Sequence, residues 1–291
     1  MVTVDLFGGL GNQMFQYALS RSLALKNESS LTLRPIDVGA FSKREYALGC
    51  FRLAPGVQIK RAGGDRRQAS WEKLLAKFGR FLFLGKREVI IREKYFPFDP
   101  TILELRGSDI HLYGYWQSEK YFRDIRKTIL EDFTFVYPLS QRNQKILHEI
   151  KKLNSISVHV RRGDYVIDPK TRELHGDCGS EYYKQAFEII SKKISKPVFY
   201  FFSDDVDWVK KNLSASEGKN VYVDWNTGDK SYADMQLMSA CRHNILANSS
   251  FSWWGAWLNQ NKDKIVVAPK NWFKDASMDA RDLVPEGWLR I

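Results

Sequence analysis

The sequence predicts an α/β protein whose strands form parallel sheets. In the second half, five short apolar segments of strand character alternate with segments of helical period, which is typical of a parallel sheet covered on both faces. At the N-terminus, an apolar segment leads into a glycine-rich turn and then a helical pattern, an order that offers backbone N–H groups to an anion. The 291 residues suffice for two ordinary domains or one large α/β unit.

The composition indicates a folded chain with an anionic partner. Hydrophobic residues make up 44% of the sequence and aromatic residues 14%, so a large core is available and global disorder is excluded. The net charge of +11 favours nucleic acid, an anionic membrane surface or a phosphorylated substrate. The basic residues are dispersed and no RNP-like or helix-turn-helix signature accompanies them, so we expect no nucleic-acid partner.

The cysteines and the N-terminal residues indicate in which cellular compartment the protein is expected. Cys50, Cys178 and Cys241 show no CxxC spacing, which argues against a disulfide framework and a zinc site and fits a reducing compartment. The first residues lack the basic and apolar regions of a secretory signal, and no apolar run approaches membrane-spanning length. We therefore expect a soluble, cytoplasmic protein.

The first half is predicted to start with a strand at 2–7 and a helix at 14–26. Ser118 is expected to cap a helix that runs to about residue 133. The segment before it, Trp116-Gln117-Ser118, is an aromatic and polar strand end suited to facing a sugar. The remaining expected elements are strands at 31–34, 89–91 and 110–115, an exposed loop at 63–67 and a helix at 71–84.

The second half is predicted to alternate regularly after a helix at 138–154, which we take as the domain boundary. This placement gives a first domain at 1–140 and a second at 141–291. A loop is expected between the first strand and the first helix of the following series. The series consists of strands at 156–160, 197–202, 221–223, 244–247 and 265–268 and helices at 180–194, 204–213, 231–241 and 252–259.

The glycine-rich turn, Gly8-Gly9-Leu10-Gly11-Asn12-Gln13, has two interpretations. It lacks the final glycine of the dinucleotide fingerprint and the Gly-Lys-Ser/Thr of a P-loop. It either faces a ligand with its backbone amides or serves only as a tight turn between strand and helix.

Polar side chains follow each strand of the predicted second sheet. Because the carboxyl ends of parallel strands meet at one crevice, we expect these groups to converge. Arginine neutralises phosphate, hydroxyls and helix N–H groups bind its oxygens, and carboxylates accept from base and ribose donors. The set therefore predicts a nucleoside diphosphate site and comprises His159, Arg161, Arg162, Asp164, Ser203, Asp204, Asp205, Asp224, Asn248, Ser249, Ser250 and Ser252.

Asp205-Val206-Asp207 has the DxD spacing that holds a divalent metal on nucleotide-sugars. The simpler interpretation is a helix start, in which Asp204 or Asp205 caps the free amides and Asp207 complements the helix dipole. We favour the helix start, because the arginine pair supplies the same neutralising charge.

Three blocks stand in order along the chain: GGLGNQMFQYA at 8–18, HVRRGDY at 159–165 and NILANSSFSWWGAWL at 244–258. Together they resemble the signature blocks of bacterial α-1,2-fucosyltransferases, glycosyltransferase family 11. The resemblance implies a GT-B fold, two Rossmann-like domains facing across a cleft. It also implies inverting transfer from GDP-L-fucose to the 2-hydroxyl of a terminal galactose, without a metal or other cofactor. The first domain would then serve the acceptor and the second would bind GDP-fucose.

The resemblance also implies roles for single residues. Arg161 would contact the β-phosphate and His159 the guanine side, while Asp234 matches an aspartate that binds guanine. Ser249, Ser250 and Phe251 match a serine-bearing turn on the diphosphate. The alternative for Asp234 is that it is simply an exposed residue of a helix. For the cluster of Trp253, Trp254 and Trp257, we favour a place in the core over a role as a surface on which a sugar stacks. The other residues expected at the donor are Gly9, Gly11, Asn12, Gln13, Ser203, Asp204 and Asn248.

The transfer also needs an acceptor for the hydroxyl proton, normally a carboxylate or histidine within hydrogen-bond reach. Asp164 is the first candidate, with the alternative that it only pairs with an arginine. The loop at 168–177 offers others, among them His175, and Asp5 is a weaker one. A loosely bonded fucosyl cation needs little base assistance, so no single base is required. The predicted catalytic set is Arg161, Asp164 and His175.

The expected activity belongs to the assembly of a surface glycan. The +11 charge suits a lipid-linked, diphosphate-bearing β-galactoside and peripheral contact with the anionic inner membrane face. The alternative is a non-catalytic module that binds a GDP-sugar or carbohydrate. The sequence does not specify the sugar beneath the galactose.

Overall fold

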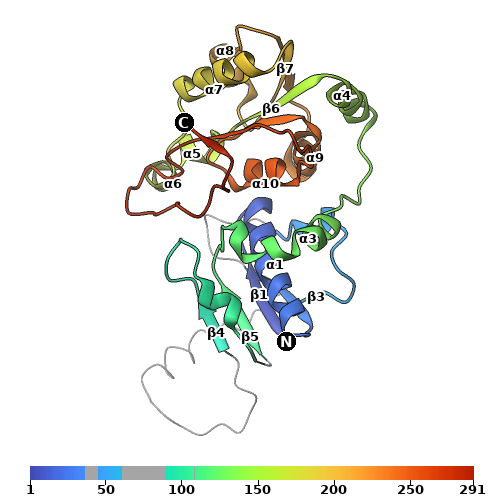
Figure 1. The fold of residues 1–291 in the computed structure, drawn as a ribbon, viewed down its shortest axis with the longest axis vertical. Coiled ribbons are helices and arrows are strands. Elements are labelled where there is room, and N and C mark those ends of the chain that lie inside the picture. The colour runs from blue at the N-terminus through green and yellow to red at the C-terminus, as the bar shows by residue number, and fades with distance from the viewer. Residues whose placement is uncertain (37–44, 61–88, 108) are drawn as a thin grey trace, which may run out of the picture.

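The computed structural model describes residues 1–36, 45–60, 89–107 and 109–291. The chain forms two α/β halves placed one above the other, with β1 (Val2–Leu6) running from the N-terminus toward the second half (Figure 1). The helix predicted at 71–84 and the loop predicted at 63–67 lie outside the described residues.

The first half contains a five-stranded parallel sheet in the order β3-β2-β1-β5-β4 within the described residues. The central strand β1 is buried along its whole length, as expected of a strand covered on both faces. The predicted strands at 2–7, 31–34 and 89–91 are confirmed. The other strands are β2 (Leu31–Pro35), β3 (Gln58–Ile59), β4 (Val89–Arg92) and β5 (Ile110–Tyr113).

Two boundaries of the first half differ from the prediction. Helix α1 (Leu10–Lys26) begins four residues early, because Gly8 and Gly9 alone make the turn and Gly9 is the N-cap. Leu10 to Gln13 are therefore the first turn of a helix, and this part of the predicted glycine-rich loop is wrong. Strand β5 ends at Tyr113 because the chain turns at once, with Trp116 at φ +58°.

The helix predicted at 118–133 is broken into three pieces. Ser118 does act as a cap, since its side chain accepts from the backbone N–H of Lys120. Phe122 then leaves the helical conformation, at φ −143° and ψ 11°, and its ring is buried in the core. The pieces are η3 (Glu119–Tyr121), η4 (Arg123–Ile125) and α3 (Arg126–Asp132); η1 (Leu48–Cys50) and η2 (Pro100–Glu104) precede them.

The second half contains a six-stranded parallel sheet in the order β11-β10-β9-β6-β7-β8, again within the described residues. All five predicted strands and all four helices of the series are confirmed, with ends shifted by a few residues. The strands are β6 (Asn154–Val160), β7 (Pro197–Ser203), β8 (Lys219–Val223), β9 (His243–Ile245), β10 (Val266–Ala268) and β11 (Leu289–Arg290).

One prediction for the second half is wrong. The segment after β6 is not a loop but carries two short helices, α5 and α6, because Asp168 caps the second and Pro169 occupies its first turn. The helices of this half are α4 (Gln141–Lys152), α5 (Gly163–Ile167), α6 (Pro169–Leu174), α7 (Ser180–Lys193), α8 (Val206–Asn212), η5 (Gly228–Lys230), α9 (Tyr232–Ala240) and α10 (Ser250–Leu258).

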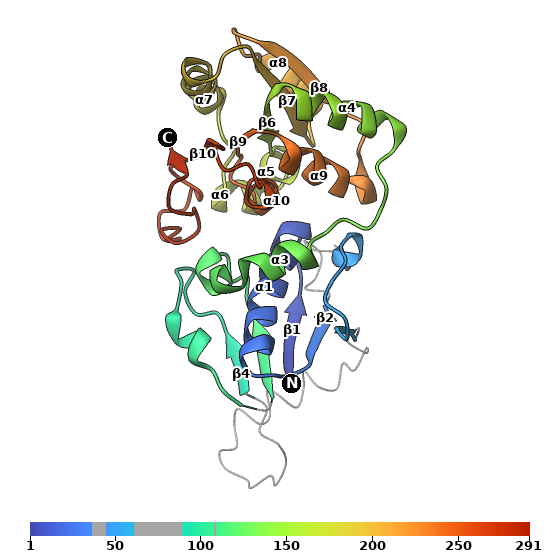
Figure 2. The same cartoon turned by 45° about the vertical axis from the view of Figure 1, so that its right-hand side comes forward.

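Helices cover both faces of the second sheet (Figure 2). Alternate residues of β7 point to opposite faces: Phe199 and Phe201 pack with α7, whereas Tyr200 and Phe202 pack with α4 and α9. Helix α4 follows residue 140 and packs on this second sheet. Every strand of the first sheet precedes residue 140, and every strand of the second follows it.

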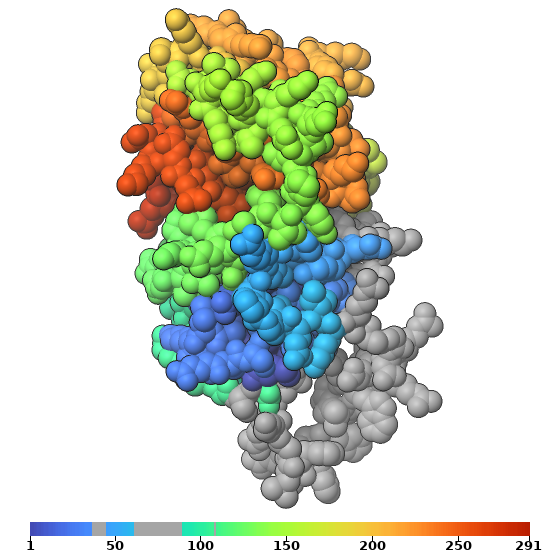
Figure 3. Space-filling view, turned by 90° about the vertical axis from the view of Figure 1, so that its right-hand side faces the viewer, coloured from blue at the N-terminus to red at the C-terminus, as the bar shows by residue number. Residues whose placement is uncertain are grey.

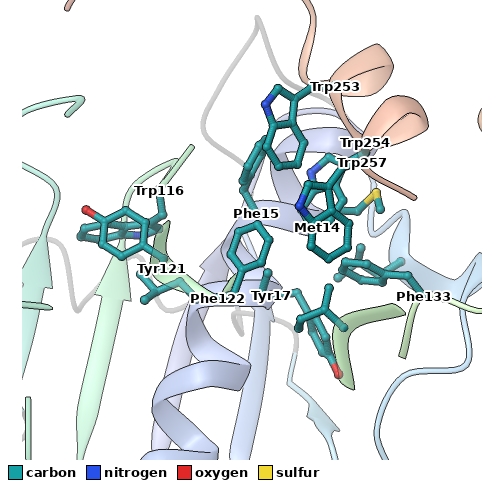
Figure 4. Packing of buried hydrophobic residues seen from close by; sticks show 14 of the residues in the cluster. Met14, Phe15, Tyr17, Trp116, Tyr121, Phe122, Phe133, Trp253, Trp254 and Trp257 are labelled. Atoms are coloured by element: carbon teal, nitrogen blue, oxygen red, sulfur yellow. The ribbon is translucent and has the colours of Figure 1, made fainter. Parts of the chain in front are cut away.

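The two halves share one aromatic core, formed mainly between α1 and α10 (Figure 4). The Phe15 ring lies 4.5 Å from that of Trp253 and 5.0 Å from that of Trp254. Phe122 stacks on Trp254 at 5.4 Å and 16°. Trp253, Trp254 and Trp257 are at most 1% exposed, so the interpretation of this cluster as core is confirmed. Figure 3 shows the halves in contact on the face where the segment before α4 passes between them.

Hydrogen bonds align the two helices at the same interface. The Trp254 Nε1–H donates to the Gly11 carbonyl at 3.0 Å. At the other end of α10, the Arg126 guanidinium donates to the Trp257 carbonyl at 3.1 Å and lies 4.1 Å from the centre of its ring. Glu119 accepts from the Trp257 indole at 3.1 Å. Within the described ranges, no helix is long and apolar enough to cross a membrane.

Replacing Gly11 with alanine is expected to destabilise the protein. A Cβ at Gly11 would lie 2.5 Å from the backbone carbon of Ser250, so α1 and α10 would have to separate. Such overpacking costs about 1 to 3 kcal/mol. Thermal denaturation should show a clearly lower Tm for G11A, whereas G179A, where a Cβ meets nothing within 4 Å, should melt near the wild type. Equal Tm values for both variants would contradict the close approach.

Candidate active site

Arg161 lies at the carboxyl end of β6 between two carboxylates. Its guanidinium is 2.7 Å from Asp164 Oδ1 and 2.9 Å from Asp204 Oδ2, and its side chain is 21% exposed. Asp164 comes from the first turn of α5, and Asp204 follows the neighbouring strand β7. Parallel pairing of β6 and β7 therefore brings together charged groups that are 40 residues apart, as the sequence predicted.

Arg162 has a different environment from its neighbour. Its backbone N–H donates to Asp204 at 2.9 Å, and its guanidinium pairs with Asp177 at 2.8 Å and Asp205 at 3.2 Å. The same guanidinium lies 3.8 Å from the centre of the Trp208 ring. Arg162 thus ties β6, the segment before α7 and the start of α8 together, and carboxylates compensate both arginine charges.

Two predicted histidines lie near this arginine and are neutral at pH 7. Burial, joined by the nearby Arg161 charge, lowers the pKa of His159 to about 4 against the opposing effect of Asp204. Burial also lowers the pKa of His175, although Asp164 acts in the opposite direction. His175 stacks on Tyr165 at 4.8 Å and 14°. The predicted catalytic residues Arg161, Asp164 and His175 therefore occupy one region.

Asp234 lies in the first turn of α9 and is not an exposed helix residue. Asn226 donates to its carboxylate at 2.7 Å, and Asn226 itself accepts from Asn143 at 2.8 Å. Burial raises the pKa of Asp234 to about 7 against the lowering effect of Asn226. This carboxyl group therefore changes charge near neutral pH.

The segment from Asn248 to Phe251 starts α10. Ser249 is the N-cap, with its Oγ accepting from the Phe251 N–H at 3.3 Å, and the Phe251 ring lies 5.5 Å from that of His159. Asn248 is buried, and its amide donates to the carbonyls of His175 at 3.0 Å and of Gly176 at 3.1 Å. Asn248 thus fixes the backbone on which His175 stands.

The predicted residues of the first block lie where the halves meet. Asn12 Oδ1 accepts from Gln117 at 2.8 Å and from Ser250 Oγ at 2.7 Å. The Gln13 amide is buried and makes three hydrogen bonds, donating to Gly8 and Glu45 carbonyls and accepting from the Ala47 N–H. Asn12 and Gly11 therefore bond across the interface between the halves, whereas Gln13 joins the start of α1 to the segment at 45–47 of the first half. Contact of Gly9, Gly11, Asn12, Gln13 or Ser250 with a donor stays a prediction.

The start of α8 matches the helix-cap interpretation. Asp205 accepts from the Trp208 N–H at 3.2 Å, Ser203 Oγ accepts from the Asp205 N–H at 3.0 Å, and Asp207 lies in the first turn. Asp224, at the end of β8, pairs with Lys210 at 2.8 Å on the surface. Among the described residues, no three His, Cys, Asp or Glu side chains form a metal-binding group.

A carboxylate that sequence reasoning missed is Glu93, which follows β4. It lines a hollow of about 270 Å³ together with Phe7, Tyr113, Gly114 and Tyr115. Burial raises the pKa of Glu93 to about 7, against two backbone hydrogen bonds that lower it. Glu93 belongs to no sequence motif. The one signal for it in the sequence was its position directly after a strand, β4, which pairs with β5.

Asp5 and a second hollow are less suited to the transfer reaction that the sequence predicts. Burial works to raise the pKa of Asp5, but hydrogen bonds from His111 and Arg34 outweigh it and hold that pKa below its usual value. Asp5 is thus a poor proton acceptor. A larger hollow of about 530 Å³ lies at the amino ends of β6 and β9, beside Asn154 and Arg242, whereas ligands of parallel sheets bind at the carboxyl ends.

Residues 82–291 match the protein family described as Glycosyl transferase family 11. The chain belongs to this family. It is therefore a glycosyltransferase, and its two halves, each with a parallel sheet, agree with the predicted GT-B class. The family match covers the strand ends of the second sheet and α10, with the predicted site residues from His159 to Phe251, whereas those of the first block precede it.

Two bacterial relatives align with nearly the whole chain, and a human relative aligns with most of it. It is 32% identical to an Escherichia coli protein named Alpha-1,2-colitosyltransferase, over 100% of this chain and 99% of that protein. It is 31% identical to the E. coli O-antigen biosynthesis glycosyltransferase WbnK, with 98% and 99% covered. Galactoside alpha-(1,2)-fucosyltransferase 1 of Homo sapiens is 26% identical over 88% of this chain and 65% of its own length.

Solved structures with a similar chain path are more distant. The NodZ alpha-1,6-fucosyltransferase soaked with GDP-fucose aligns with a TM-score of 0.48 and 12% identity, covering 88% of this chain and 92% of NodZ. The E. coli ADP-heptose lps heptosyltransferase II aligns with a TM-score of 0.47 and 12% identity, over 100% and 89%.

The raised pKa of Asp234 predicts a pH dependence of stability. The folded protein holds this proton to about pH 7, whereas an ordinary aspartate loses it near 3.8. The contribution to the free energy of unfolding is therefore full below about pH 3.8 and is lost as the pH rises to 7. Urea unfolding between pH 5 and 8 should show a shallower fall for Asp234→Asn than for the wild type. The same slope in both proteins would contradict the burial of this charge; exposed Asp229→Asn is the control.

Proposed function

We propose that this glycosyltransferase transfers L-fucose from GDP-L-fucose to the 2-hydroxyl of a terminal galactose, with inversion, in a surface glycan. The observation that carries the proposal is the position of Arg161, held by two carboxylates at the carboxyl end of β6. The names of the colitosyl- and fucosyltransferase relatives support α-1,2 linkage.

In this proposal the donor lies along the carboxyl edge of the second sheet. Arg161 pairs with the β-phosphate, and the α10 start at Ser249 and Ser250 supplies amides and hydroxyls to the remaining oxygens. Asp234, once ionised, accepts hydrogen bonds from guanine, and His159 lies on the nucleotide side. The guanidinium charge neutralises the diphosphate, so we propose that no metal is needed.

The chemical step is a single displacement. The acceptor oxygen forms a bond to the fucose anomeric carbon as the bond to the phosphate oxygen breaks, and GDP leaves with the electron pair. Arg161 stabilises the charge that develops on GDP. The hydroxyl proton passes to Asp164, which stands 2.7 Å from Arg161, or to the neutral imidazole of His175. The ion pair holds the Asp164 carboxylate beside the leaving group.

The similarity to a colitosyltransferase over the whole chain favours a second donor, GDP-colitose. Colitose is fucose without its 3-hydroxyl, so both sugars present the same anomeric centre. A site built to hydrogen-bond that hydroxyl would reject colitose strongly, whereas an apolar contact there would accept both.

Nucleotide selectivity is the first prediction of this proposal. GDP should raise the Tm of the protein more than UDP, ADP or dTDP, because a ligand that binds only the folded state stabilises it. Arg161→Ala should abolish the shift, while Arg123→Ala, which changes a surface arginine paired with Asp124, should retain it. Equal shifts with all four nucleotides would contradict the assignment of guanine.

Transfer itself is the second prediction. With GDP-fucose and a β-galactoside, the product should carry an α-1,2 linkage by NMR, and activity should persist in EDTA. Arg161→Ala should lower kcat by about 100-fold or more, the loss expected when charge stabilisation is removed from a transition state. GDP binding without transfer from GDP-fucose or GDP-colitose would instead indicate a non-catalytic binding module.

We also propose that the natural acceptor is lipid-linked, at an anionic membrane surface, because the chain carries a charge of +11. The same assay decides this point, with diphosphate-bearing lipid-linked and free oligosaccharides compared at low and high salt. Equal turnover of the two acceptors would remove the support for it.

A further inference from the structure

The first domain has a hollow at the carboxyl edge of its sheet. Phe7 follows β1, Tyr113 ends β5 and Glu93 follows β4, three strands that lie side by side. Together with Gly114 and Tyr115 they enclose about 270 Å³. Pockets for drug-sized ligands span roughly 300 to 1,000 Å³, so this hollow suits a single small ring.

The walls of the hollow are aromatic and fixed. Phe7 and Tyr113 stack with centroids 5.2 Å apart, and Tyr115 meets Phe7 edge-on at 5.0 Å while remaining 40% exposed. The buried Gln16 joins the two strand ends, since it accepts from the Phe7 N–H and donates to the Gly114 carbonyl, each at 3.1 Å. The aromatic faces are therefore in place before any ligand arrives.

The polar group of the hollow is the Glu93 carboxylate, and the backbone is shaped to hold it. One oxygen accepts from the Tyr115 N–H at 2.7 Å and the other from the Trp116 N–H at 3.0 Å. A Cβ at position 114 would lie 2.4 Å from the Glu93 Cβ, so only glycine admits this approach. A carboxylate has about four acceptor sites, so lone pairs remain for a ligand hydroxyl.

The segment that carries Glu93 also reaches the donor side of the molecule. The Phe96 ring meets Phe273 edge-on at 5.0 Å, and Phe273 lies 5.3 Å from the His175 ring. His175 in turn stacks on Tyr165, the last residue of the HVRRGDY block. Three residues beyond Glu93, a row of ring contacts thus starts at Phe96 and leads to Tyr165, which lies 5.7 Å from the Arg161 guanidinium.

We propose that this hollow is the subsite for a neutral pyranose of the acceptor glycan, stacked on Tyr115 and hydrogen-bonded through a hydroxyl to Glu93. The inference rests on the proposed function and adds the acceptor residues to it. The C–H face of a pyranose is apolar and gains from covering an aromatic ring. The ionised carboxylate repels an acidic sugar, so a neutral pyranose is favoured over uronic and sialic acids.

Glu93 makes acceptor binding depend on pH. Its pKa of about 7 means that it is largely protonated at pH 6 and ionised at pH 8. The groups that face it are the phenols of Tyr115 and Tyr121, whose own pKa values are raised by burial, and Arg92 lies 5.2 Å from the Tyr113 ring. Only the ionised form offers full charge to a hydroxyl donor, so the acceptor KM should fall as the pH rises from 6 to 8.

Tyr115 provides the main test, because its ring is partly exposed and can be changed without emptying the core. Tyr115→Ala should raise the acceptor KM about fivefold or more and leave kcat and the Kd for GDP within twofold. Tyr115→Phe, which keeps the ring, should restore the wild-type KM. Tyr95→Ala removes an 80% exposed tyrosine that does not line the hollow and is the matched control.

Glu93→Gln is the second test, read by its pH profile. Its amide NH₂ faces one of the two backbone N–H groups, so we expect a lower Tm, but a purely structural role would leave the pH dependence of KM intact. The proposal expects a KM raised about tenfold and independent of pH between 6 and 8. Transfer with unchanged acceptor KM in both variants would overturn the subsite alone, whereas a wild type that binds no GDP and transfers no sugar would overturn the proposed function.

Discussion

The contact between α1 and α10 determines how the rest of the molecule is arranged. Phe15 packs against both Trp253 and Trp254, and the Trp254 indole bonds to the Gly11 carbonyl. Each such aromatic side chain contributes roughly 1.5 to 3 kcal/mol on burial. Because α1 directly follows β1 and α10 follows β9, this contact turns the carboxyl ends of the strands of both sheets toward the boundary between the halves.

The two strand-end regions that result have different chemistry. The groups around Arg161 and Arg162 are charged, and each arginine is paired with carboxylates. This region suits a polyanionic donor, because its phosphates can replace carboxylates as partners of the arginines. Around Phe7 and Tyr115 they are aromatic with one clamped carboxylate, which suits a neutral ring with hydroxyls. The proposed reaction has one substrate of each kind, a polyanionic donor and a neutral acceptor. Each half of the molecule contains a strand-end region that suits one of them.

The fold could be predicted largely from local pattern, whereas the site could be predicted only in part. Strands such as β7 are short apolar runs, so their existence followed from sequence, and the HVRRGDY block placed Arg161 and Asp164 together. Glu93 was missed because its unusual environment comes from residues that are distant in the sequence. The glycine and the two backbone amides that surround it follow β5, 21 to 23 residues away, and form no motif with it. Phe122 broke a predicted helix because a partner 132 residues distant, Trp254, stacks on it.

The shared core also bears on how such an enzyme can be divided or recombined. Residue 140 separates the two sheets in the chain, but α10 buries its tryptophans against helices of the other half. An isolated second half would expose Trp254 and Trp257 to water and would be prone to self-association. A chimera of two relatives joined near residue 140 would place an α1 from one parent against an α10 from the other. A chimera that exchanges specificity between family members therefore needs α1 and α10 from the same parent.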